Sequence, residues 1–536
     1  MTQAIVQANQ TQRQRQNVEF FGKGFGGMKT FQYFGKGGQR VDNMYLTSQY
    51  FEAQPGISTE KDTSEDNLYG IGAFQKTDGT YQKLYIILDG SDYKLRALEE
   101  SGTIVTPTGG DGDVTFDTAN FRFAQVGATG YVGTDSTSYP LYSWDGAALT
   151  SVGVAGGTDP DRIDSMWVEG KRLSCTDKSQ GFPLFSKIAT TLADWSASGN
   201  GSAVAGSYDS MPRIPTCGIY AGGYSIIFTE QEGKANKVTP TDDNTDILVT
   251  TGVEAWNCNV GFDSQDKITA SDNFVYGAKE SGLYRVDPRD GKTKNLIENA
   301  GAIERYWNSF DFDSAKVIWY PREKWVCIFC KESGDAVNSL AVLYSEEYDA
   351  FYLRTNTFVR DAVLAGDDLF AIEDSGGKIL KLFDRTASRV HADDSDQANR
   401  IITEWDGFGD TKIEKRLKRV VIHASLFPDD EMVARVYKNG DTNNPVIEQS
   451  FSGVDLVDTS GGTATLGEYV LGVGNPDDLG PTSDKIERFK SSSKGSTFCV
   501  EIVCTTNNDF QVHSVMLEYK SRGKLIHSLN MANNLF

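Results

Sequence analysis

Short stretches in which apolar and polar residues alternate recur along the whole chain. Lys316–Cys330 and Val512–Tyr519 are clear examples, with a period near two that is typical of a half-buried strand. Long helical periodicity is hard to find, and the chain has 54 Gly but only 14 Pro, which is typical of turn-rich β structure. The pattern therefore predicts a mainly β protein.

A leucine or aromatic pair followed by a polar, glycine-ended turn recurs through the first three quarters of the chain. Leu95, Leu141 and Leu184 are 46 and 43 residues apart, and each follows another short apolar run. A repeat of roughly 40–50 residues with several strands per unit is in the range of β-propeller blades. We therefore expect a β-propeller over residues 41–390, with about seven blades and six or eight also open. The segment 40–58 is expected to lend a strand that closes the ring.

The spacing of the apolar runs changes after residues 391–400, HADDSDQANR, which we interpret as an acidic linker. Longer strand patterns follow, and the turn Lys438–Gly440 joins two of them. These patterns predict an antiparallel β-sandwich or barrel-like platform domain over residues 401–526. Residues 527–536 are short and nearly uncharged, which fits either a docking peptide or a loose end.

Residues 1–40 have the composition of a flexible arm rich in Gln and Gly. We expect this arm to reach a neighbouring subunit or another partner, and not to pack into the propeller core. Its aromatic residues are the expected anchors: Phe20, Phe21, Phe31, Tyr33 and Phe34.

The arm also contains GKGFGG at residues 22–27, which matches the glycine pattern of nucleotide-binding loops. Met28 stands where a phosphate-binding loop has its lysine, and no βαβ unit follows to supply a helix N-terminus. We therefore predict no nucleotide or other cofactor here.

The stretch DPRDG, Asp287–Gly291, has the composition of an acidic cation loop. A calcium loop requires a longer series of ligands that ends in a bidentate Glu, and this series is missing. The same residues favour a turn, because Pro fixes its φ angle, the Asp side chain can hydrogen-bond to a nearby backbone N–H, and Gly accepts a positive φ. We therefore expect a hairpin turn and no metal site.

The charge balance is strongly acidic, with 52 basic and 74 acidic residues and a net charge of −22. A protein that wraps nucleic acid through phosphate contacts needs an excess of Lys and Arg, so that class is disfavoured. An acidic wall can still line a passage for DNA, because a repelling surface does not hold the polymer. Simple solubility explains the same composition.

Cysteine usage and the N-terminal sequence favour a protein made in the cytoplasm. Seven cysteines without a disulfide-type spacing predict reduced thiols. Cys327 and Cys330 form a CxxC on a strand, where residues three apart point to opposite faces, so two buried thiols are expected and not a zinc site. The first twenty residues show no secretory signal, and no apolar run approaches the ~18 residues of a spanning helix.

No catalytic residue is predicted, and we expect the protein not to be an enzyme. The four histidines are His391, His423, His513 and His527, all outside the apolar runs assigned to the propeller. Motifs such as GxSxG and HExxH are absent. Acidic clusters at residues 109–113 and 311–314 leave a glycosidase pair open, because such a pair is defined by its separation in space.

Several features together resemble the tail nozzle proteins of short-tailed bacteriophages, also called tail tubular or tail stabilisation proteins. These features are the early Pro55–Gly56, the LY-type strands and the segment His513–Lys524, which ends in a basic turn at Lys520, Arg522, Gly523 and Lys524. The resemblance implies a structural virion protein in the tail, assembled in the host cytoplasm. It would form a ring below the portal and adaptor, contact tail fibre or spike proteins, and conduct DNA during ejection. Contact with the host envelope at the tail tip is also implied, although this chain is shorter than the larger members.

Two other classes remain as alternatives: a tail fibre or tip protein that binds a host receptor, and a propeller hydrolase. If the resemblance holds, we expect a homo-oligomeric ring, as a hexamer, with DNA in the common axis and not in the propeller's own hole. The basic strand 416–423 and the turn 520–524 are expected to face acidic residues of a neighbour, such as Asp429–Glu431. Simple solvation of these charges is the competing interpretation.

Overall fold

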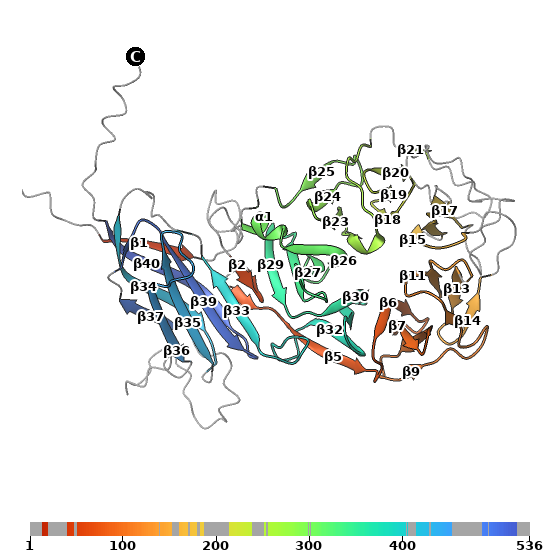
Figure 1. The fold of residues 1–536 in the computed structure, drawn as a ribbon, viewed down its shortest axis with the longest axis horizontal. Coiled ribbons are helices and arrows are strands. Elements are labelled where there is room, and N and C mark those ends of the chain that lie inside the picture. Colours follow the sequence, from red (N-terminus) through yellow and green to blue (C-terminus); the bar gives the residue numbers. More distant parts are fainter. Residues whose placement is uncertain are drawn as a thin grey trace, which may run out of the picture. The chain divides into compact units, whose positions relative to one another are not determined.

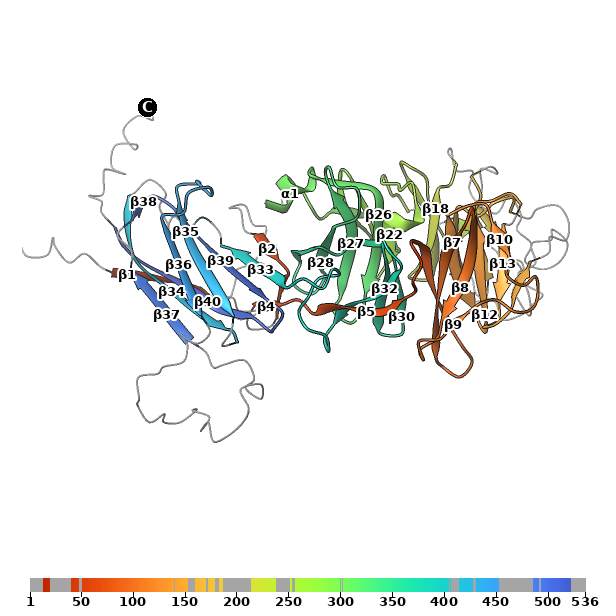
Figure 2. The ribbon, with the colours of Figure 1, turned by 60° about the horizontal axis from the view of Figure 1, so that its bottom comes forward.

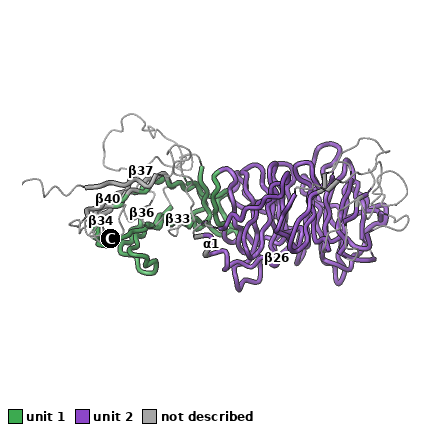
Figure 3. Tube along the Cα trace, turned by 90° about the horizontal axis from the view of Figure 1, so that it is seen from above, with its two compact units in different colours: residues 1–55, 348–354, 388–536 green, residues 56–347, 355–387 purple. Residues whose placement is uncertain are grey.

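The computed structural model describes residues 13–19, 40–47, 51–138, 140–152, 160–169, 172–178, 183–186, 214–237, 251–252, 256–298, 300, 302–403, 405, 414–427, 430–452, 485–490 and 493–521. This part of the chain is mainly β, as predicted. It forms two compact units, shown in different colours in Figure 3. We call residues 56–347 with 355–387 the ring unit, and residues 1–55, 348–354 and 388–536 the two-sheet unit.

Seven groups of antiparallel strands, which we call sheets, make up the described part of the ring unit (Figure 1). The sixth is one part of a nine-stranded sheet. The first contains β6 (Leu68–Gln75), β7 (Tyr81–Asp89), β8 (Asp92–Leu98), β9 (Ile104–Val105) and β10 (Thr115–Phe116). The second contains β11 (Phe121–Val126), β12 (Thr129–Thr134), β13 (Leu141–Trp144) and β14 (Leu149–Ser151). The third contains β15 (Ser165–Glu169), β16 (Arg172–Thr176) and β17 (Pro183–Phe185).

The remaining four sheets follow in chain order. The fourth contains β18 (Cys217–Ala221), β19 (Tyr224–Phe228), β20 (Gly233–Lys237) and β21 (Thr251–Gly252). The short helix η1 (Gln265–Lys267) precedes the fifth, which contains β22 (Ile268–Ala270), β23 (Val275–Lys279), β24 (Gly282–Val286) and β25 (Thr293–Asn295). Helix α1 (Ala302–Trp307) leads to the sixth, with β26 (Phe310–Tyr320), β27 (Trp325–Glu332) and β28 (Leu340–Ser345). The seventh contains β30 (Val359–Ala365), β31 (Asp368–Glu373), β32 (Lys378–Asp384) and β5 (Gly56–Asp62).

The first strands of consecutive sheets contact one another and complete a circle. Their order is β6, β11, β15, β18, β22, β26 and β30, and β30 contacts β6 again. The last sheet takes its outer strand from the start of the unit, because β5 pairs antiparallel with β32. The closing strand expected within residues 40–58 is therefore β5, which overlaps that segment only at 56–58.

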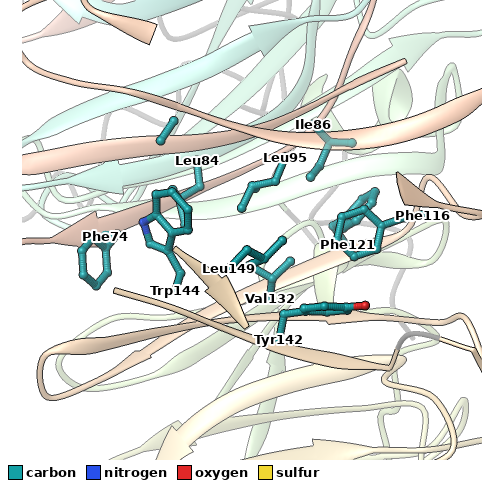
Figure 4. Packing of buried hydrophobic residues seen from close by; sticks show 11 residues of the cluster. Phe74, Leu84, Ile86, Leu95, Phe116, Phe121, Val132, Tyr142, Trp144 and Leu149 are labelled. Atoms are coloured by element: carbon teal, nitrogen blue, oxygen red, sulfur yellow. The ribbon is translucent and has the colours of Figure 1, made fainter. Parts of the chain in front are cut away.

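Apolar clusters fill the spaces between neighbouring sheets of the ring unit. Figure 4 shows one between the first two sheets, where Trp144 lies among Phe74, Leu84 and Leu149. The Trp144 side chain is fully buried, and its Nε1 donates to Oε1 of the buried Gln82 at 2.9 Å. Comparable clusters lie between the second and third, fourth and fifth, and first and seventh sheets.

Glycine allows some of these sheets to approach closely. A Cβ at Gly72 of β6 would lie 2.3 Å from the Phe123 ring of β11, and one at Gly277 of β23 would lie 2.3 Å from the Phe262 ring. Any other residue at these positions would force the neighbouring aromatic ring to move.

The two-sheet unit brings together distant segments of the chain (Figure 2). Its first sheet contains, in spatial order, β29 (Ala350–Thr355), β2 (Arg40–Asp42), β33 (Gln397–Ile402), β39 (Phe498–Thr506), β35 (Glu431–Lys438) and β36 (Ile447–Ser452). Its second contains β3 (Met44–Leu46), β4 (Phe51–Ala53), β40 (Gln511–Ser521), β34 (Lys415–Ser425) and β37 (Lys485–Lys490), with β1 (Arg13–Glu19) beside β40 and β38 (Lys494–Gly495) beside β34. Most of the described residues on the inner positions of β34 and β40 are apolar and buried, among them Leu417, Val420, Ile422, Val515 and Leu517.

These units differ from the predicted boundaries 41–390 and 401–526 for a physical reason. Strand β2 pairs with both β29 and β33, so residues 41–55 and 348–354 pack with C-terminal strands. Part of the linker expected at 391–400 belongs to β33. Residues 13–19 of the arm expected at 1–40 form β1, paired along its whole length with β40, and this pairing was not predicted.

We predict that Trp144→Ala lowers the free energy of unfolding of the ring unit by about 3–5 kcal/mol, because it opens a cavity between two sheets. Denaturant unfolding, followed by circular dichroism, measures the change. Leu88→Ala is the matched control, since Leu88 is 36% exposed and should change stability by less than about 0.5 kcal/mol. An equal decrease in the free energy of unfolding of the two variants would contradict the packing described.

Candidate functional site

The DPRDG stretch is a turn in the structure, between the paired strands β24 and β25. Asp287 Oδ1 accepts from the backbone N–H of Arg289 at 2.9 Å, and Gly291 has φ +72°. The two carboxylates are engaged by basic neighbours, Asp287 with Arg289 at 2.9 Å and Asp290 with Lys292 at 2.5 Å. Hydrogen bonds from these neighbours lower the pKa of both carboxyls. The turn interpretation is confirmed.

The cysteines and histidines offer no assembled site among the described residues. All seven cysteines are free and buried, and burial raises the pKa of Cys327 and Cys330. His391 is buried, whereas the side chains of His423 and His513 and the whole of His527 lie outside the described residues. In the part of the chain that the structure describes, no group of three His, Cys, Asp or Glu residues could hold a metal ion.

Other sequence-based candidates are separated or lie outside the described residues. Asp111 and Asp113 line an open cavity of about 780 Å³, and Asp113 forms an ion pair with Arg96 at 2.7 Å. The stretch 22–27, Met28, the five aromatic anchors of the arm and the turn residues Arg522–Lys524 lie outside the described residues. No helix in the described part is both long and apolar enough to cross a membrane.

The centre of the ring unit contains a network of charged side chains from four inner elements. Arg122 of β11 contacts Asp266 of η1, with Nη2 and Oδ2 3.0 Å apart. Lys316 of β26 contacts Asp266 Oδ1 at 3.1 Å and Asp361 Oδ1 of β30 at 2.6 Å. Asp361 Oδ2 also accepts from the backbone N–H of Ile71 in β6, at 2.9 Å. The chain Arg122–Asp266–Lys316–Asp361, which we call the central ion network, thus joins β6, β11, β26 and β30 through η1.

The central ion network lines two cavities. One of about 370 Å³ is bounded by the inner strands and by all four residues of the network. A second, of about 240 Å³, is polar and includes Asp135, Arg162, Asp164 and Lys178. Arg162 pairs with Asp164 at 2.8 Å in this second cavity.

Opposite charges control the ionisation of the network. Burial would raise the pKa of Asp266, but Arg122 and Lys316 outweigh this effect and lower it well below its usual range. Burial would lower the pKa of Lys316, but Asp361 and Asp266 raise it to about 12. Asp266 and Lys316 are therefore both charged at neutral pH.

The arrangement is suited to holding strands together. Each carboxylate of the network is neutralised by a neighbouring cation, and the described residues lining the two cavities include neither His nor Cys. Sequence reasoning missed the network. The only available signal was a charged residue inside an otherwise apolar inner strand, as in FRFAQV, KVIW and VRDAVLA.

No family model and no curated protein matches the chain. Among solved structures, it is similar to the extracellular domain of a one component system from B. thetaiotaomicron, with 9% identity, a TM-score of 0.36, and 60% of this chain and 39% of that chain covered. It is also similar to a protein from Desulfotomaculum acetoxidans, with 8% identity, a TM-score of 0.32 and coverages of 47% and 84%. It is similar as well to a protein from Listeria monocytogenes, with 10% identity and a TM-score of 0.31, and with 59% of this chain and 94% of that chain covered. The chain spans about two fifths of the B. thetaiotaomicron domain, and TM-scores this low do not establish a shared fold.

We predict that Lys316→Met destabilises the ring unit, because it leaves Asp266 and Asp361 without their shared cation. Removing one partner of a buried pair costs about 3–5 kcal/mol, and partial exposure of these side chains reduces the expectation to about 1–3 kcal/mol. Lys316→Met with Asp361→Asn should lose less than the sum of the single variants. Lys292→Met, at an 85% exposed side chain, is the control and should leave the unfolding midpoint unchanged. Additive losses would show that the network is not coupled.

We also predict a pH signature for Asp266. Its folded pKa is lowered, so its stabilising effect is complete above the unfolded value of about 3.9 and is lost as the pH falls below it. The difference in melting temperature between wild type and Asp266→Asn should be constant between pH 6 and 8 and shrink below about pH 4. A difference that does not change with pH would contradict an ionised Asp266.

Proposed function

We propose that this chain is a structural protein of a bacteriophage tail that forms the ring, or nozzle, through which DNA leaves the virion. In this proposal the ring unit is a seven-bladed β-propeller, and the two-sheet unit is a β-sandwich platform. The protein is assembled in the host cytoplasm, and its partners are copies of itself, the portal or adaptor, and tail fibre or spike proteins. DNA passes through without specific binding.

The observation that carries the proposal is the central ion network. It links strands across the centre of the ring unit and leaves a cavity of about 370 Å³. At roughly 30 Å³ per water, this cavity holds about a dozen water molecules, far too few for a DNA duplex to pass. In this proposal, DNA therefore passes between copies, around a common axis.

Charge supports the same proposal. Nearly all of the net charge of −22 lies in the sequence of the ring unit. An acidic wall repels phosphate, so that a duplex can slide along it without being held. If ring units line the common passage, they supply this wall.

The main alternative, a receptor-binding fibre or tip protein, differs in its symmetry. We predict that mass photometry and negative-stain microscopy of the purified chain show closed rings of identical copies, with a hexamer as the expected number. Trimers would favour a fibre. Stable monomers that hydrolyse glycans or esters in a saturable way would favour a hydrolase.

A further inference from the structure

A row of basic residues crosses the second sheet of the two-sheet unit. The backbone register pairs β1 with β40, β40 with β34 and β34 with β38, which aligns Arg13, Lys520, Arg416 and Lys494. Residues directly opposite each other in antiparallel strands belong to one face of the sheet. Strands lie about 4.8 Å apart, so the row places four cationic residues within about 15 Å.

The next row on the same face is also mainly basic. Its register aligns Arg15 of β1, Glu518 of β40, Arg419 of β34 and Lys490 of β37. A register shift between Leu417 and Arg419 keeps both rows on one face, although Arg416 and Arg419 are three positions apart. We call the two rows together the basic face.

The basic face lies opposite the apolar core of its sheet. Leu417, Val420 and Ile422 of β34 are buried at the intervening register positions, paired with residues 519, 517 and 515 of β40. Among the described side chains of the rows, Lys494 is exposed and Arg416 is half-buried, with Nε lacking a hydrogen-bond partner.

An anionic partner would stabilise such a face. Like charges directly opposite each other in a sheet are destabilising, and this row places cationic residues opposite one another on four adjacent strands. The chain as a whole is strongly acidic, so a basic face within it is a local exception that composition does not explain.

We propose that the basic face binds the acidic surface of the ring unit of a second copy. This inference rests on the proposed ring function and specifies the contact that builds the ring. Charge complementarity favours this partner, because nearly all of the net negative charge belongs to the ring unit. Two different surfaces that bind each other form a head-to-tail interface, which is the kind that closes into rings. Nucleic acid is the less favoured partner, since a chain of net charge −22 repels it at long range.

The first test is self-association of the full chain, measured by mass photometry from 50 to 500 mM salt. Lys494→Glu with Lys520→Glu should weaken association at least tenfold, and added salt should weaken the wild type. The control is Lys292→Glu with Lys294→Glu, two exposed lysines of the ring unit. It makes the same change in net charge outside the basic face and should not weaken association. Circular dichroism and thermal melts confirm that each variant is folded.

The second test maps the contact. A mixture of ¹⁴N- and ¹⁵N-labelled chains is treated with a carbodiimide, which joins lysines to carboxylates in direct contact, and the cross-linked peptides are identified by mass spectrometry. We expect mixed-isotope links from Lys494 or Lys520 to Asp or Glu residues of the ring unit. Links from these lysines only within one chain, or only to the two-sheet unit, would overturn the inference.

Other outcomes separate the inference from the proposed function. If the variant still forms wild-type rings, the basic face is not the interface, although the ring function stands. If the wild type is monomeric at every concentration, the ring function itself fails. If rings persist but the variant loses binding to a 30-base-pair duplex, the partner of this face is DNA and the inference is overturned.

Discussion

The pairing of β5 with β32 is the constraint on which the ring unit depends. It joins residue 62 to residue 378, so the sheet that ends the circle is completed by the segment that begins it. The entropic cost of closing so long a loop grows only slowly with its length, by about 0.6 kcal/mol per doubling. Without β5, the edge of β32 would remain unpaired and open to strands of other chains. Once the circle is closed, every sheet has a neighbour on both sides, and the apolar cluster between the first and seventh sheets can form.

Closure of the circle of sheets also brings the inner strands together at the centre of the ring unit. The inner strands converge there around a cavity of about 370 Å³. Lys316 meets two carboxylates from different elements, Asp266 and Asp361, and Arg122 neutralises the first of them. This use of charge ties η1 and three strands together. The central ion network is therefore neutralised within the ring unit, which is why we look for function in how copies assemble.

The sequence predicted the mainly β class and the hairpin turn at Asp287–Gly291, because each follows from local pattern and turn chemistry. It placed the closing strand within residues 40–58, whereas β5 overlaps that segment only at 56–58. It could not predict that residues 41–55 join C-terminal strands, or that residues 13–19 lie along β40. Both are pairings between segments hundreds of residues apart, which leave no local trace. The central ion network was missed for the same reason: Arg122 and Lys316 each look like an isolated charge on a strand, and only the closed circle brings them to Asp266.

A cryo-electron microscopy map of the assembled oligomer is the most direct measurement of the central claim. The account predicts continuous density across the axis of each ring unit at Arg122, Asp266 and Lys316, and an open passage along the symmetry axis between copies. A passage wide enough for a duplex through the middle of a single ring unit would contradict it.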